Sequence, residues 1–300
     1  MTDSIQPTDK NRPAASRMQW KTVSAIGTAT WLATAQLSGC ADEQSSGTPA
    51  EPAVTDDAHS GHSATPPATT GGEGAGGEGE GAATAGAEFS TDDAAYLTQL
   101  SLIRGHLAVG YALYQNDLPD LAETHMKHPR AEIYTTVEPA FAARGCNGFG
   151  DGLSALTASV TERGSQEQVT AAYESLVAGI ATCEAGADIQ DPQVIAQVIE
   201  SLIRTAGIEY AIGVVDGKMN NLHEYQDAWG FTQIAQTWAR SSAFATEPKA
   251  TAVAAQLQSL ISSLDELWPS LNPDGGVEGK AAQLYGAAGQ VQVIALALTK

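Results

Sequence analysis

The sequence predicts an all-α fold, a duplicated helical bundle of about eight or nine helices behind a disordered N-terminal tether. Apolar residues recur at helical spacing from about residue 92 to the end of the chain, and no segment alternates with the period of two that marks a strand. The composition also changes sharply near residue 89. The part beyond that change, residues 90–300, is long enough to bury a core as one domain.

The helices of the first half are delimited by caps, prolines and glycines. Ser90 or Thr91 can cap the first helix, and the acids that follow suit its positive end. Pro119 can begin the second helix, and Pro129 is expected to begin a third, which Pro139 kinks or ends. The segment 145–152 is expected to be a loop or a loose helix start. The expected helices span residues 92–115, 119–128, 129 onward, 153–163 and 166–185.

The second half repeats these signals. Asp191 and Pro192 provide a cap and a first helical position, and Asp216-Gly217 is expected to turn the chain after the first helix. Residues 269–276 are rich in turn-forming residues and separate the last two helices. The expected helices span residues 191–215, 222–244, 248–267 and 277–299.

A short internal repeat suggests that the two halves are related. Residues 101–104 and 201–204 both read Ser-Leu-Ile-Arg, and each copy is followed by a similar tyrosine-containing helix turn and then by a His and a Glu near the start of a helix. We therefore expect two repeat-like halves, about 92–186 and 191–300, that bury their apolar faces within and between themselves. The alternative is a chance likeness between helices rich in Leu and Ile.

The N-terminal region has the pattern of a bacterial lipoprotein signal. An apolar run of about 15 residues, too short for a comfortable membrane span, leads to Leu37-Ser38-Gly39-Cys40. We interpret residues 1–39 as a signal peptide and Cys40 as the lipidated first residue of the mature chain. The alternatives are an ordinary secretory signal or an N-terminal anchor.

Residues 40–89 are expected to form a disordered linker. They are dominated by Gly, Ala, Thr, Pro, Ser and Glu and contain no Lys or Arg, so they cannot bury a core. The lipid would hold the domain on the periplasmic side of the cell envelope, and Ala41 in place of Asp favours the outer membrane over the inner. The membrane is thus an expected partner.

Charge and motifs exclude several function classes. The chain has a formal net charge of −20, which repels nucleic acid, so no nucleic-acid partner is expected. It contains no Gly-x-Ser-x-Gly, no His-Glu-x-x-His and no phosphate-binding loop, so nothing indicates an enzyme. An acidic surface tolerates cationic partners, including metal ions.

Two cysteines remain for the folded domain, Cys146 and Cys183. An even pair in an oxidising compartment predicts a disulfide. Two buried, unlinked thiols are the alternative.

Several histidines and acids form a candidate metal site. Iron and other divalent ions are bound by carboxylates and imidazoles that converge from several helices. His125, His128 and Glu132 would share one face of an unbroken helix, although Pro129 argues against such a helix. Ordinary roles are also open, such as a partly buried histidine or a carboxylate at a helix start. The candidate ligands are His106, His125, His128, Glu132, Glu209 and Glu224.

Two segments carry a family resemblance. Residues 209–218 (EYAIGVVDGK) and 224–231 (EYQDAWGF) resemble the extracytoplasmic domain attached to bacterial iron permeases. That domain has an acid-Tyr pair, an Ala-Val-x-Asp-Gly-Lys turn and a Glu-Tyr-x-x-x-x-x-Phe helix. Its leading Asp is Glu209 here, and the Arg-Glu-x-x-Glu motifs of the permease do not occur in these 300 residues. The resemblance implies a helical module of the iron-transport type, and a looser likeness is to imelysin-type iron-regulated lipoproteins.

Two functions follow as hypotheses. In the first, an envelope-anchored periplasmic lipoprotein binds or hands over a metal ion, iron or another divalent metal, as an accessory to uptake by an iron permease. In the second, a non-enzymatic helical lipoprotein presents an interaction surface to another envelope protein. Exposed Trp229, Trp238 or Trp268 would favour the second hypothesis, and convergence of the six candidate ligands would favour the first.

Replacing Cys40 tests the anchor. We expect Cys40→Ala to move the protein from the membrane fraction to the soluble fraction, because two or more acyl chains anchor a protein stably and this variant has none. Cell fractionation with immunodetection measures the change. A variant that stays with the membranes as the wild-type chain does would contradict the assignment.

Overall fold

The computed structural model describes residues 88–299, and this part of the chain is all-α. It begins with one helical turn at residues 88–91. The expected signal peptide, Cys40 and nearly all of the linker lie outside the described residues.

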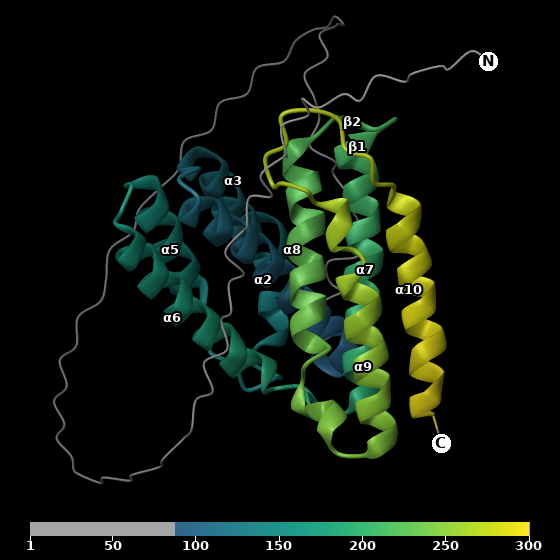
Figure 1. The fold of residues 1–300 in the computed structure, drawn as a ribbon. Coiled ribbons are helices and arrows are strands. Elements are labelled where there is room, and N and C mark those ends of the chain that lie inside the picture. Colours follow the sequence, from purple (N-terminus) through teal and green to yellow (C-terminus); the bar gives the residue numbers. More distant parts are fainter. Residues whose placement is uncertain (1–87, 300) are drawn as a thin grey trace, which may run out of the picture. The chain divides into compact units, whose positions relative to one another are not determined.

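The first half contains four main helices that pack as a ring (Figure 1). α2 packs on α3, α3 on α5, α5 on α6, and α6 returns to α2. Short π, α and 3₁₀ turns (η1, α4 and η2) connect α3 to the loop before α5. The bounds are α2 Asp93–Gln115, α3 Pro119–Pro129, η1 Arg130–Tyr134, α4 Thr135–Val137, η2 Glu138–Ala140, α5 Gly150–Thr161 and α6 Gln166–Glu184.

The second half has the same neighbour order. α7 packs on α8, α8 on α9, α9 on α10, and α10 returns to α7. A two-stranded antiparallel hairpin, β1–β2, joins α7 to α8. The bounds are α7 Pro192–Gly213, β1 Val214–Val215, β2 Lys218–Met219, α8 Leu222–Trp238, η3 Ser242–Ala245, α9 Pro248–Ser262, η4 Asp265–Leu267, α10 Ala281–Ala295 and η5 Leu296–Leu298.

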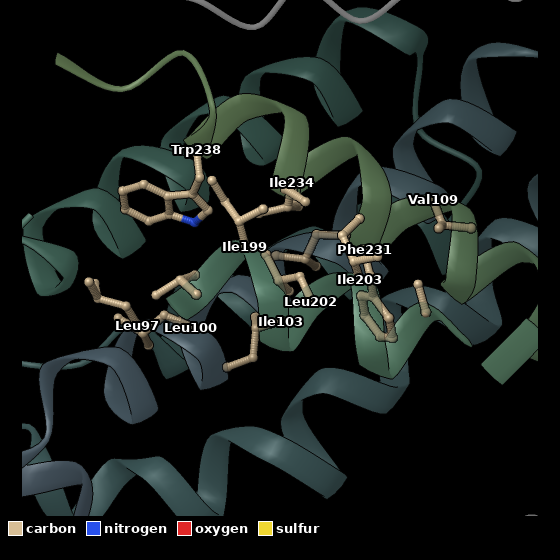
Figure 2. Close-up of a cluster of buried hydrophobic side chains, with 14 of the residues drawn as sticks. Leu97, Leu100, Ile103, Val109, Ile199, Leu202, Ile203, Phe231, Ile234 and Trp238 are labelled. Atoms are coloured by element: carbon tan, nitrogen blue, oxygen red, sulfur yellow. The ribbon is translucent and has the colours of Figure 1, made fainter. Parts of the chain in front are cut away.

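The two four-helix sets are joined through their leading helices. α2 packs against both α7 and α8, so the halves share a core rather than standing as separate domains. Figure 2 shows this shared core, with side chains from α2, α7 and α8 interleaved. Its buried residues include Leu97, Leu100, Ile103, Ile199, Leu202, Ile203, Phe231, Ile234 and Trp238. The expected pair of bundle-like halves is therefore present in the described chain.

The repeated Ser-Leu-Ile-Arg sequence occupies the same place in both sets, on α2 and on α7, but its polar residues have diverged in role. Ser101 is buried and accepts a hydrogen bond from Trp238 Nε1 at 2.8 Å. Arg104 forms a bidentate pair with Glu184 of α6, whereas Arg204 pairs with Glu200 on its own helix. The polar residues of the first copy therefore hold helices together, whereas Arg204 of the second copy is exposed.

Helix starts follow the expected chemistry with one shift. Asp191 accepts from the Gln193 amide, as a cap should, but α2 is capped by Asp92, which accepts from the Ala95 amide, rather than by Ser90 or Thr91. Ser165 and Gln168 form a reciprocal capping box at the start of α6. These bonds satisfy amides that have no partner within the helix.

Three expectations need correction. Pro129 does not start a separate helix, because the chain stays helical through it and widens into the π turn η1. The helix expected over 222–244 ends at Trp238, and the last helix begins at Ala281 rather than near 277. The turn at Asp216-Gly217 closes a short hairpin, in which both residues have positive φ, the geometry that Asp-Gly favours.

The last helix is apolar but belongs to the bundle. Ala281–Leu298 is long and apolar enough to cross a membrane by length and composition alone. In the structure α10 packs against α7 and α9, with Leu284, Ala288 and Val291 buried. Only 22% of this segment is buried, and Tyr285, Val293 and Leu296 are exposed.

The structure joins Cys146, in the loop before α5, to Cys183 near the end of α6. Tyr96 of α2 donates to the Cys183 carbonyl at 3.2 Å, and the Arg144 guanidinium lies over the Tyr96 ring. Arg144 also pairs with Asp93. The disulfide holds the loop before α5 on the end of α6, and the contacts of Tyr96 and Arg144 hold this unit against the start of α2.

Breaking this bond should lower stability. We expect Cys146→Ser with Cys183→Ser to reduce the free energy of unfolding by about 2–4 kcal/mol, because the bond constrains a long loop in the unfolded chain. Denaturant unfolding with and without reductant measures it. Reductant should destabilise the wild-type chain and leave the variant unchanged. Two free thiols in unreduced, unfolded wild-type protein would contradict the pairing.

Candidate metal centre

A close helix crossing creates the site. α2 and α8 touch where two glycines face each other, and a Cβ on Gly230 would lie 2.4 Å from the Gly105 carbonyl oxygen. A Cβ on Gly105 would collide with the Phe231 ring. Only glycine permits this approach. It brings His106, the residue after Gly105, against the first turns of α8.

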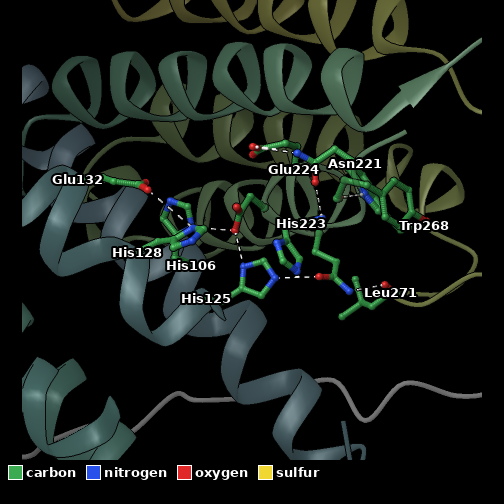
Figure 3. A network of polar contacts seen from close by, with 12 residues as sticks. His106, His125, His128, Glu132, Asn221, His223, Glu224, Trp268 and Leu271 are labelled. Carbon is green, nitrogen blue, oxygen red and sulfur yellow. Dashed lines mark hydrogen bonds and ion pairs between the residues drawn. The ribbon is translucent and has the colours of Figure 1, made fainter. Parts of the chain in front are cut away.

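All six predicted ligands gather around this crossing: Figure 3 labels His106, His125, His128, Glu132 and Glu224, and Glu209 interacts with Glu224 and His106. They come from both halves: one from α2, two from α3, one from the π turn η1, one from α7 and one from α8. The structure adds residues that the sequence reasoning did not include, above all Asp227 and His223 of α8. The gathered ionisable residues are His106, His125, His128, Glu132, Glu209, His223, Glu224 and Asp227.

Asp227 is the centre of the inner part of the cluster. Its side chain is 2% exposed, and its Oδ1 atom lies 2.7 Å from His106 Nδ1 and 2.9 Å from His125 Nδ1. Burial by itself would raise the pKa of Asp227, but the two histidines outweigh it and hold the pKa well below its usual range. Asp227 is therefore a carboxylate with two imidazole nitrogens on one oxygen.

The two histidines differ in their bonding. His125 is fully buried, and its second ring nitrogen, Nε2, lies 2.8 Å from Gln226 Oε1. His106 Nδ1 is buried and lies 2.7 Å from Asp227 Oδ1, with which it forms an ion pair when the imidazole is protonated. Burial lowers the pKa of His106, but Asp227 outweighs that effect, so the pKa is raised.

A pair of carboxyl groups forms the next layer. Glu209 of α7 and Glu224 of α8 are hydrogen bonded to each other. Burial, followed by the neighbouring Glu224, raises the pKa of Glu209 to about 8. Burial and then Asp227 also raise the pKa of Glu224. The pair thus retains a proton near neutral pH that a cation could displace.

The outer layer reaches solvent. The His128 side chain is 25% exposed and lies on the same helical face as Glu132, whose side chain is 55% exposed. The π turn after Pro129 keeps these two residues together, with His128 Nδ1 3.9 Å from Glu132 Oε1. The His223 ring packs against those of His125 and His128, with centroids 5.5 and 6.5 Å apart. The imidazoles of His128, His223 and His125 therefore form a series of ring contacts from the partly exposed His128 to the buried His125 beside Asp227.

The donor set fits a metal ion. His106, His125 and Asp227 each offer one ligand atom, and these atoms lie within 4.8 Å of one another. Two imidazoles and a carboxylate suit iron and other borderline divalent ions. His106 Nδ1 is a buried nitrogen that faces the Asp227 carboxylate, so a cation could take the place of the proton between them.

The residues that sequence reasoning missed had a detectable signal. His223 and Asp227 are four residues apart, and Glu224 and Asp227 are three apart, so all three side chains share one face of α8. Asp227 also lies inside the EYQDAWGF segment. Gln226 lies in the same segment, but its residue type gave no signal, because a neutral amide is not a usual metal ligand.

A known protein family matches the second four-helix set. Residues 185–295 match the model of the family described as the iron permease-associated 4-helix bundle domain. The match covers α7 to α10, the second four-helix set, which is less than half of the chain. It confirms the resemblance to the iron permease family over those residues. No curated protein and no solved structure matches the chain.

The Glu209 carboxyl predicts a pH dependence of stability. Its pKa in the folded chain, about 8, lies above the ordinary value of 4.5, so its contribution to stability is present below pH 4.5 and is lost as pH rises toward 8. We expect metal-free Glu209→Gln to gain thermal stability over the wild-type chain at pH 8, and to gain much less at pH 5.

Thermal unfolding after chelation measures this difference. Glu174→Gln removes the same charge from an exposed site on α6 and should show no pH-dependent gain. An equal effect of Glu209→Gln at both pH values would contradict the raised pKa.

Proposed function

We propose that this protein is an envelope lipoprotein that binds iron where its two helical bundles meet and hands it to an uptake system. The observation that carries the proposal is the convergence of all six predicted ligands, with Asp227, at the α2–α8 crossing. The iron permease-associated family of the second bundle supplies the iron-uptake context. An iron permease is the proposed partner.

The charge of the cluster suits a cation as cargo. Four carboxyl groups and four imidazoles converge there, and within residues 88–299 no Lys or Arg forms an ion pair with Asp227, Glu209 or Glu224. Structural carboxylates in protein interiors are more often paired with fixed positive side chains. Excess carboxylate without such a partner favours binding of an added cation.

The gradient of exposure suits transfer. Side-chain exposure falls from 55% at Glu132 through 25% at His128 to 0% at His125. An ion could be taken up by the outer residues and bound by the inner ones, or leave in the reverse order. The lipid on Cys40 and the linker would keep the domain within reach of a membrane partner.

The alternative of a purely structural interaction module lacks its aromatic anchors. Trp238 and Trp268 are buried, and Trp268 Nε1 donates to the Tyr225 carbonyl at 3.0 Å. Trp229 is half-buried. These rings stabilise the bundle and its loop, so they are not free to fill pockets on a partner.

Metal binding by the full-length chain tests the proposal. We expect about one equivalent of Fe(II) to bind in anaerobic calorimetry, and His106→Ala and Glu224→Gln each to weaken binding at least tenfold, which is about 1.4 kcal/mol. Each variant removes a ligand or a charge from the cluster. Mass spectrometry of the purified protein identifies the metal acquired in the cell.

Glu174→Gln is the matched control for Glu224→Gln, because it removes the same charge from a helix outside the cluster and should bind like the wild-type chain. Wild-type protein that binds no metal more tightly than about 1 mM, or ~4 kcal/mol, would refute the proposal.

A further inference from the structure

We infer that the inner cation site consists of His106 Nδ1, His125 Nδ1 and the Asp227 carboxylate, and that it binds Fe(II) or a similar divalent ion. Gln226 is the positioning residue that orients His125 Nδ1 toward the ion. The inference deepens the proposed function and rests on it. It assigns different roles to two adjacent residues of α8: Asp227 is a ligand, and Gln226 orients the ligand His125.

The orientation of the Gln226 amide is fixed from outside the site. Its Nε2 group donates to the Leu271 carbonyl at 2.8 Å, in the loop after η4. That loop is held on α8 by two further bonds, from Tyr225 Oη to the Ser270 carbonyl at 2.8 Å and from Trp268 Nε1 to the Tyr225 carbonyl. A flipped amide would place two oxygens against each other, so Gln226 Oε1 must face His125.

An oxygen facing His125 determines where that ring carries its hydrogen. Gln226 Oε1 accepts only, so His125 Nε2, 2.8 Å away, must be the donor. In the neutral ring the other nitrogen, Nδ1, then has a lone pair directed at Asp227 Oδ1, 2.9 Å away. Two electron-rich atoms at that distance need a proton or a cation between them.

His106 completes the set from the other helix. Its Nδ1 atom is buried and lies 2.7 Å from Asp227 Oδ1, close enough for one proton or one cation to bridge the two atoms. Two atoms that bind one ion at about 2.1 Å cannot be more than about 4.2 Å apart, and both Nδ1–Oδ1 distances are well below that limit. One ion could therefore contact Asp227 and either imidazole after only small adjustments.

The donors define the class of ion. Two neutral imidazoles and one carboxylate match the set that proteins use for Fe(II), whereas Mg²⁺ and Ca²⁺ prefer oxygen ligands alone. Metal-bound histidines usually donate their second N–H to a fixed acceptor, which is the part that Gln226 plays for His125. The outer carboxyl pair, Glu209 and Glu224, lies beyond this set.

The hydrogen on His125 can be observed without any metal. Long-range ¹H–¹⁵N spectra of the chelated full-length protein should show His125 protonated on Nε2, whether the ring is neutral or charged. A neutral ring that is protonated on Nδ1 and bare on Nε2 would overturn the inference. This readout does not depend on whether the proposed function is correct.

Metal affinity tests the positioning role. We expect Gln226→Met, which keeps the length of the side chain but loses the acceptor, to weaken Fe(II) binding 10–100-fold. Gln233→Met, on the same helix and half-buried, should stay within twofold of the wild-type chain. Competition with a chromophoric chelator measures the affinity, and circular dichroism checks that each variant is folded.

The outcomes separate the two claims. Wild-type protein that binds no Fe(II) refutes the proposed function and this inference together. Wild-type protein that binds, with Gln226→Met binding equally well, refutes the inference alone. If Gln226→Met does not fold, the position of the His125 hydrogen in the wild-type spectra decides.

Discussion

A carboxylate buried between two imidazoles is the constraint on which this structure depends. Asp227 is 2% exposed and comes from the second bundle, while His106 and His125 come from the first. An isolated buried carboxylate is strongly unfavourable, so Asp227 requires those partners, and removing one would leave a charge without compensation. The glycine crossing of α2 and α8 brings the partners close enough, and the shared apolar core holds that crossing in place.

The candidate site is composite, and this changes how the family match should be understood. The residues that match the iron permease-associated 4-helix bundle supply Glu209, His223, Glu224 and Asp227. The other four ionisable residues, His106, His125, His128 and Glu132, come from the first bundle, which has the same order of packing but lies outside the match. The second bundle alone supplies three acids and one histidine, whereas the first supplies three histidines and one acid. The first bundle is therefore needed for a nitrogen-rich metal site.

Local patterns predicted the helices well, because amphipathic spacing and caps act over a few residues. The six candidate ligands were named from the sequence because His and acid residues are visible there, and the structure brings them together. Other features depended on distant contacts. Pro129 was expected to break a helix, but a π turn absorbs it and keeps His128 beside Glu132. Gln226 could not be recognised, because its role depends on the Leu271 carbonyl, which only the folded loop places next to it.

X-ray absorption at the iron edge of Fe(II)-loaded, full-length protein tests the central claim most directly. The account predicts an inner shell of nitrogen and oxygen that includes two imidazoles, with the outer-shell scattering that imidazole rings produce. In the His125→Ala variant, the iron should keep only one of the two imidazole ligands. A shell made only of oxygen, with no imidazole scattering, would place the iron elsewhere and contradict a metal centre at the junction of the two bundles.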